Sequence, residues 1–160
     1  MRAAYITAMS TAPRQSLSSM PALWNIIDTG DEGDSGDLTP LMISTRTGTA
    51  AAVAEFLLQQ PGLDISCPDS HGRTAAHWAS NYGRADILAM LLAAPSLKGS
   101  LNTRDSWGHT PLGTAVSCGQ VECVRLLAGV PGVSLDTSSG QGLEWQARWV
   151  LVRSGQVGAC

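Results

Sequence analysis

The sequence predicts an all-α solenoid of stacked helix-turn-helix units that are joined by loop fingers. The main observation is a pattern that occurs three times, with its threonines at Thr39, Thr74 and Thr110, 35 and 36 residues apart. In each unit a glycine follows nine residues after the threonine, and a pair of leucines follows the glycine. Internal repeats with a period of about 20–50 residues indicate a solenoid or a related repeat architecture.

The threonine of each unit is expected to begin a short first helix. Its hydroxyl can cap the helix, and the proline that follows it in two units, Pro40 and Pro111, loses no hydrogen bond at the first helical position. The glycine nine residues on supplies the left-handed conformation that ends such a helix. These glycines are Gly48, Gly83 and Gly119.

A longer second helix is expected after each glycine. In the third unit Val121, Val124 and Leu127 fall on one side, as in a helix that buries a single face. Proline cannot continue a helix, so a proline is expected to end each of these segments. The prolines concerned are Pro61, Pro95 and Pro131. The segments that follow, such as 67–72 and 104–108, have the composition of turns.

Segments 69–79, 105–112 and 119–127 resemble ankyrin repeats, whose unit is a β-turn plus two helices with a T-P-L-H-x-A signature. The resemblance covers residues 34–137 and implies three repeats at about 34–68, 69–104 and 105–137. Residues 1–33 are expected to be a mostly disordered leader, with an N-capping turn at 21–27. Residues 138–160 are expected to form a degenerate fourth repeat or a capping helix, followed by a disordered tail.

The units depart from the family pattern at a few positions. The second has Ala75 and Ala76 in place of Pro-Leu, and we expect Trp78 to fill the space that this smaller pair leaves. The signature histidine is present only as His77, which we expect to bond a neighbouring loop. The first and third units have Met42 and Gly113 at that position.

Both ends of the chain leave alternatives open. Residues 28–37 hold five acidic residues and are interpreted as a solvated loop or as an acidic partner-binding stripe. Trp145 and Trp149 belong to a capping helix, to a partner-binding pair or to a segment without regular structure. The N-terminus is a weak match to an organelle transit peptide. The chain could also be one piece of a longer repeat array.

The composition argues against several classes of function. The net charge of −3 disfavours nucleic-acid binding, and no apolar run approaches the ~20 residues that span a bilayer. No phosphate loop, metal-ligand spacing or nucleophile motif is present, so we expect no enzyme, no cofactor and no metal. A Cys67–His71 dyad is a minor alternative. Cys118 and Cys123 are interpreted as small packing residues, and the protein as a monomer of the cytoplasm or nucleus.

The family resemblance implies protein–protein recognition by the concave face, through positions around the loop glycine and at the end of the first helix. The positions carried over are Arg46, Thr47, Ser70, His71, Arg73, Asn81, Tyr82, Ser106, Trp107, His109, Ser117 and Cys118. Trp107 is the strongest candidate, and the alternative is that it packs on the adjacent loop. The leading hypothesis is a non-enzymatic adaptor. The alternatives are an inhibitory subunit of a partner enzyme and a substrate-recognition subunit of a ubiquitin ligase.

Overall fold

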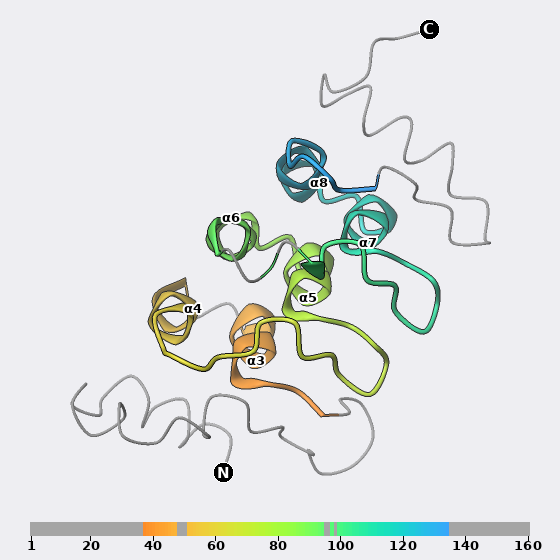
Figure 1. Cartoon of the computed structure of the whole chain (residues 1–160). Coiled ribbons are helices and arrows are strands. Elements are labelled where there is room, and N and C mark those ends of the chain that lie inside the picture. The colour runs from red at the N-terminus through yellow and green to blue at the C-terminus, as the bar shows by residue number, and fades with distance from the viewer. Residues whose placement is uncertain (1–36, 48–50, 95–96, 98, 135–160) are drawn as a thin grey trace, which may run out of the picture.

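The computed structural model describes residues 37–47, 51–94, 97 and 99–134, and this part of the chain forms three helix pairs. The pairs are α3 (Pro40–Thr47) with α4 (Ala51–Leu58), α5 (Ala75–Asn81) with α6 (Ala85–Ala93), and α7 (Pro111–Ser117) with α8 (Val121–Ala128). In Figure 1 the first helices α3, α5 and α7 form one row and the second helices form another, with loop fingers projecting beside the first row. The predicted all-α solenoid is confirmed.

The first helices begin as the threonines predict. The Thr110 hydroxyl accepts a hydrogen bond from the Gly113 N–H at 3.1 Å, and Thr39 accepts one from the Met42 N–H at 3.4 Å. Each hydroxyl therefore satisfies an amide that the helix itself leaves unpaired. The second helices end at Leu58, Ala93 and Ala128, each two or three residues before the proline expected to stop it.

The core repeats along the solenoid. Each helix contacts its counterpart in the next repeat, α3 against α5 and α5 against α7 in one row, and α4 against α6 and α6 against α8 in the other. Leu57, Leu91 and Leu127 occupy equivalent positions on the second helices and are all fully buried. Each repeat thus buries its apolar face against its neighbours, as expected of a solenoid.

The second and third fingers are each closed by an aspartate. Asp69 Oδ1 accepts the backbone N–H groups of His71 and Arg73 at 2.9 and 2.8 Å. Asp105, 36 residues later, makes the same pair of bonds at 3.0 and 2.8 Å. The Ser106 N–H also donates to the His71 carbonyl at 2.9 Å. These bonds give the two fingers a defined shape and join them side by side.

His77 links the second repeat to the third finger. Its Nε2 lies 3.1 Å from the His109 carbonyl oxygen, which can only accept, so Nε2 carries the proton. Its Nδ1 then accepts the Thr74 N–H at 3.1 Å. Burial lowers the pKa of His77, which is 1% exposed, although the bond to the His109 carbonyl opposes the shift. The predicted loop-bracing role of His77 is confirmed, and the ring acts in its neutral form.

Trp78 is 4% exposed, and its indole N–H donates to Asp69 Oδ2 at 3.1 Å. That its ring fills space left by Ala75 and Ala76 stays a prediction. The predictions for the leader, for the acidic stripe up to residue 36 and for residues 138–160 lie outside the described residues. Within the described residues, no helix has the length and apolarity to cross a membrane.

Candidate protein-binding surface

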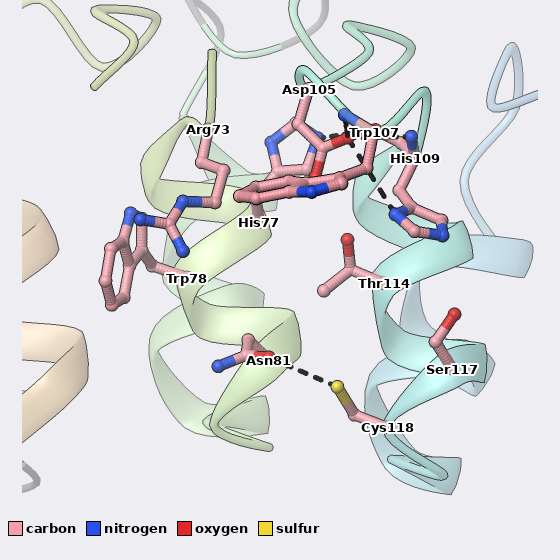
Figure 2. Close-up of a pocket in the computed structure, with 10 residues that line it drawn as sticks. All are labelled: Arg73, His77, Trp78, Asn81, Asp105, Trp107, His109, Thr114, Ser117 and Cys118. Carbon is pink, nitrogen blue, oxygen red and sulfur yellow. Dashed lines mark hydrogen bonds and ion pairs between the residues drawn. The ribbon is translucent and has the colours of Figure 1, made fainter. Parts of the chain in front are cut away.

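A pocket of about 300 Å³ lies between α5 and α7, below the third finger (Figure 2). Its walls come from two repeats and from their fingers. The lining residues are Arg73, His77, Trp78, Asn81, Asp105, Trp107, His109, Thr114, Ser117 and Cys118. Because the adjacent helices contact each other closely, the position of these side chains depends on the stacking of the repeats.

Trp107 covers the top of this pocket in Figure 2. Its indole stacks on His71 of the preceding finger, with ring centroids 5.3 Å apart and planes 6° apart. The residue nevertheless remains 55% exposed. Trp107 thus packs on the adjacent loop, as the alternative interpretation predicts, and still presents a large apolar surface to solvent; that it binds a partner stays a prediction.

Arg73 lies between two indoles. Its guanidinium carbon is 4.2 Å from the ring centroid of Trp78 and 5.7 Å from that of Trp107, within the range of cation–π attraction. Its Nε donates to Asp69 Oδ2 at 2.8 Å. These contacts restrict the orientation of Arg73, which braces the second finger in addition to lining the pocket.

Tyr82 continues this arrangement along α5. Its ring stacks on Trp78, with centroids 5.8 Å and planes 12° apart. Together the five side chains form a continuous row, called here the aromatic row. Its members are His71, Trp107, Arg73, Trp78 and Tyr82. Within the described residues, the large hydrophobic side chains that are exposed are Tyr82, at 41%, and Trp107, and both belong to this row.

The lower wall of the pocket is polar. The Cys118 thiol donates to Asn81 Oδ1 at 3.2 Å, so two predicted binding residues from different repeats lie together (Figure 2). Cys118 is exposed, and its interpretation as a packing residue is wrong because its position at the end of α7 faces solvent. Cys123 is 1% exposed, and its predicted packing role is confirmed.

The three thiols that the structure describes are poor nucleophiles. Partial desolvation raises the pKa of the Cys67 and Cys118 thiols, and burial raises the pKa of Cys123 to about 11, so each of these thiols is protonated near neutral pH. The Cys67 thiol contacts the Pro68 carbonyl at 3.9 Å, whereas His71 Nδ1 lies 3.2 Å from the Ser70 hydroxyl. Cys67 and His71 therefore do not form the dyad considered as a minor alternative.

Half of the sequence-predicted positions line the pocket. They are Arg73, Asn81, Trp107, His109, Ser117 and Cys118. His71 and Tyr82 extend the aromatic row, and Ser70 and Ser106 are exposed on the fingers. Arg46 lies near the end of α3 and does not line this pocket, and the side chain of Thr47 is outside the described set.

Sequence reasoning did not single out Trp78, Asp105 or Thr114 as part of a binding surface. The 36-residue offset from Asp69 was a usable signal for Asp105, because Asp69 closes the preceding finger in the same way. Among the described residues, no group of three or more His, Cys, Asp or Glu side chains could hold a metal ion.

The family model described as ankyrin repeats (3 copies) matches the chain over two overlapping ranges, residues 15–105 and 61–139. The protein belongs to the ankyrin-repeat family. These repeats are protein–protein interaction modules, and the family is generally non-catalytic.

Three curated relatives are similar over part of their length. The 26S proteasome non-ATPase regulatory subunit 10 of Dictyostelium discoideum is 37% identical over 71 residues, which cover 44% of this chain and 30% of that protein. The ankyrin repeat domain-containing protein 37 of Xenopus tropicalis is 32% identical over 100 residues, 61% of this chain and 57% of that protein. The liver isoform of mitochondrial glutaminase from Rattus norvegicus is 31% identical over 98 residues, 61% of this chain and 16% of that protein.

Proposed function

We propose that this protein is a non-enzymatic adaptor that binds a partner protein through its concave face, at the pocket between α5 and α7 and along the aromatic row. The observation that carries the proposal is the position of Trp107 and Tyr82. They are the exposed large hydrophobic residues of the described chain, and both lie in one row beside the pocket. Exposed apolar surface gathered in one place is typical of an interaction site.

The types of residue on this surface are those that contribute most to the binding energy of protein interfaces. Trp, Tyr and Arg are enriched among the residues that dominate binding energy at protein interfaces. Trp107 and Arg73 are also held in place by stacking and by the bond to Asp69, so little conformational entropy is lost when they bind. Burial of the exposed part of Trp107 would contribute about 2 kcal/mol, or roughly thirtyfold in affinity.

An alternative is a regulatory subunit that binds and restrains a partner enzyme. It is favoured by the similarity to a protein named as a regulatory subunit of the 26S proteasome, over 44% of this chain. The two proposals share the same binding surface. They differ in the outcome for the partner, since a regulatory subunit lowers the partner's activity as its concentration rises and an adaptor leaves that activity unchanged.

The test is affinity capture of partners followed by mass spectrometry, with three versions of the protein. The wild type is compared with the double variant Trp107→Ala/Tyr82→Ala and with the control Arg125→Ala, whose side chain is 53% exposed on α8 in the other row. We expect a protein that the wild type and the control capture and the double variant does not. Equal capture by all three, with circular dichroism showing equal helix content, would overturn the proposal.

A further inference from the structure

The second finger shows how this fold satisfies the aspartate that closes each finger. Asp69 Oδ1 bonds the finger backbone, and Asp69 Oδ2 accepts from Arg73 Nε at 2.8 Å and from the Trp78 indole at 3.1 Å. The guanidinium lies over the Trp78 ring at 4.2 Å. Both carboxylate oxygens of this 5% exposed residue therefore have partners, and one partner is a stacked guanidinium.

The third finger repeats the aspartate but lacks these two partners. Asp105 corresponds to Asp69, and 36 residues after Arg73 and Trp78 the chain has His109 and Thr114. Asp105 Oδ1 bonds the finger backbone as before, and the His109 ring lies 3.8 Å from the same oxygen. Within the part of the chain that the structure describes, Asp105 Oδ2 has no hydrogen-bond or ion-pair partner, although the side chain is 5% exposed.

The pocket lies where the third repeat lacks the counterparts of Arg73 and Trp78. Thr114 is much smaller than Trp78, and it lies across the pocket from the indole of Trp107 in Figure 2. A carboxylate oxygen that lacks a protein partner and belongs to a largely buried side chain favours a charged donor, and an indole face attracts a cation. The pocket of about 300 Å³ has both features in its lining, and the space is large enough for one long side chain.

The charges around the pocket favour a cationic occupant. Arg73 is neutralised by its ion pair with Asp69, and His77 is neutral because burial lowers its pKa. Among the residues that line the pocket, Asp105 is the acidic one, and within the described residues it forms no ion pair with an arginine or lysine. The whole chain carries a net charge of −3. An acidic side chain would meet repulsion here, whereas a basic one would meet attraction.

We propose that this pocket binds an arginine side chain of the partner, which donates to Asp105 Oδ2 and stacks beneath the indole of Trp107. The partner arginine would thus give Asp105 a charged donor that stacks on an indole, as Arg73 does for Asp69 in the second finger. This inference rests on the proposed adaptor function and names the chemistry of its partner as a basic segment with an accessible arginine. Arginine is favoured over lysine because its planar guanidinium both stacks and donates in a fork.

The test uses three capped pentapeptides, with arginine, citrulline or alanine at the centre of four glycines. Citrulline has nearly the shape of arginine without its charge. Binding is followed by NMR through the indole N–H signal of Trp107, which is assigned by its loss in Trp107→Ala. The arginine peptide is expected to shift this signal in a saturable way, with at least about tenfold weaker binding of the citrulline peptide.

Two variants make the test specific. Asp105→Asn keeps an oxygen for the finger amides and removes the charge, and it is expected to weaken arginine binding by about tenfold or more. The double variant His109→Arg/Thr114→Trp rebuilds the arrangement of the second finger and fills the pocket from within. We expect this double variant to keep its helix content and to lose the response to the arginine peptide. It therefore tests whether the peptide binds in the pocket even if Asp105→Asn does not fold.

No response of the wild type, or an equal response to the citrulline peptide, would overturn the arginine proposal. The same holds if arginine binding persists unchanged in the folded double variant. The adaptor proposal has a separate readout, because it depends on the capture lost in Trp107→Ala/Tyr82→Ala. Lost capture without an arginine response would leave the adaptor proposal in place and remove the arginine proposal alone.

Discussion

Asp69 is the residue on which the second finger depends most. Its buried carboxylate accepts two backbone N–H groups, the Arg73 guanidinium and the Trp78 indole, at distances from 2.8 to 3.1 Å. Charge-assisted hydrogen bonds of this kind are stronger than neutral ones. Removal of the carboxylate would leave a buried indole N–H and a partly buried guanidinium without their partner.

Asp69→Ala is therefore expected to lower the free energy of unfolding by about 2–4 kcal/mol. Urea denaturation followed by circular dichroism measures this change. Glu122→Ala is the control, because Glu122 forms an exposed ion pair with Arg125 at 4.0 Å, and its loss is expected to change stability by no more than about 0.5 kcal/mol. Similar midpoints for the two variants would show that the finger is not held by this carboxylate.

His77 is expected to make the stability of the protein depend on pH. Burial lowers its pKa in the folded state, while the unfolded chain takes up this proton near pH 6.5. Between these two pKa values the unfolded state binds more protons than the folded state. The free energy of unfolding therefore falls as the pH is lowered below about 6.5, and this loss is complete once the pH passes below the folded-state pKa.

This second prediction is checked by urea denaturation at several pH values between neutral and acidic. His77→Asn removes the titrating ring and keeps a polar side chain, and it is expected to flatten the dependence in this range. His109→Asn is the comparison, because His109 accepts the His77 bond through its backbone carbonyl and keeps that carbonyl when its side chain changes. A pH dependence of equal steepness in wild type and His77→Asn would contradict the assignment.

At the scale of the elements, the turn between the paired helices depends on glycine. Gly83 and Gly119 occupy equivalent turns, with φ of +65° and +68°, a region that other residues rarely adopt. An added Cβ at Gly83 would also meet the side chain of Gln120, whereas one at Gly119 would meet nothing. Substitution is therefore unfavourable at both glycines because of their positive φ, and at Gly83 also because of the contact with Gln120.

Gly119→Ala is expected to destabilise the protein by about 1 kcal/mol through backbone strain, and Gly83→Ala by about 1–2 kcal/mol because the Gln120 side chain must also move. The measurement is the shift in the midpoint of thermal unfolding. In Gly83→Ala/Gln120→Ala the contact is absent, so the extra loss should disappear relative to Gln120→Ala alone. An equal effect of the two glycine substitutions would show that Gln120 moves at no cost.

The helices of this fold could be predicted from local chemistry, because threonine, glycine and proline act within a few residues of their own positions. Thr110 caps α7 through an amide three residues away, and Gly119 turns the chain directly after it. The exposure of Trp107 could also be predicted locally, since a large aromatic residue in a turn has few nearby residues that could bury it. The position of Arg73 in the second finger could also be predicted locally, because Arg73 directly follows the loop glycine Gly72.

The pocket could not be predicted in this way, because it depends on which residues of two repeats face each other. Thr114 matters because it stands where the preceding repeat has Trp78, and Asp105 matters because its second oxygen lacks the partner that Asp69 has. The contact between Asn81 and Cys118 likewise joins positions 37 residues apart. These relations appear only when the repeats are stacked.

For the whole molecule, stability comes from contacts between successive repeats. Leu91 on α6 is fully buried, and its helix contacts α4 on one side and α8 on the other. A repeat cannot bury its apolar face alone, and about three repeats are needed for a stable solenoid. Damage to the central pair therefore weakens both interfaces at once.

Leu91→Ala is accordingly expected to lower the free energy of unfolding by about 2–5 kcal/mol, a large part of the total for a chain of this size. Leu126→Ala is the control, since Leu126 is only partly buried on the last described helix. Because the interfaces are coupled, far-UV circular dichroism and tryptophan fluorescence should report the same lowered midpoint in Leu91→Ala. Separate midpoints for the two probes would mean that the protein does not unfold as one cooperative unit.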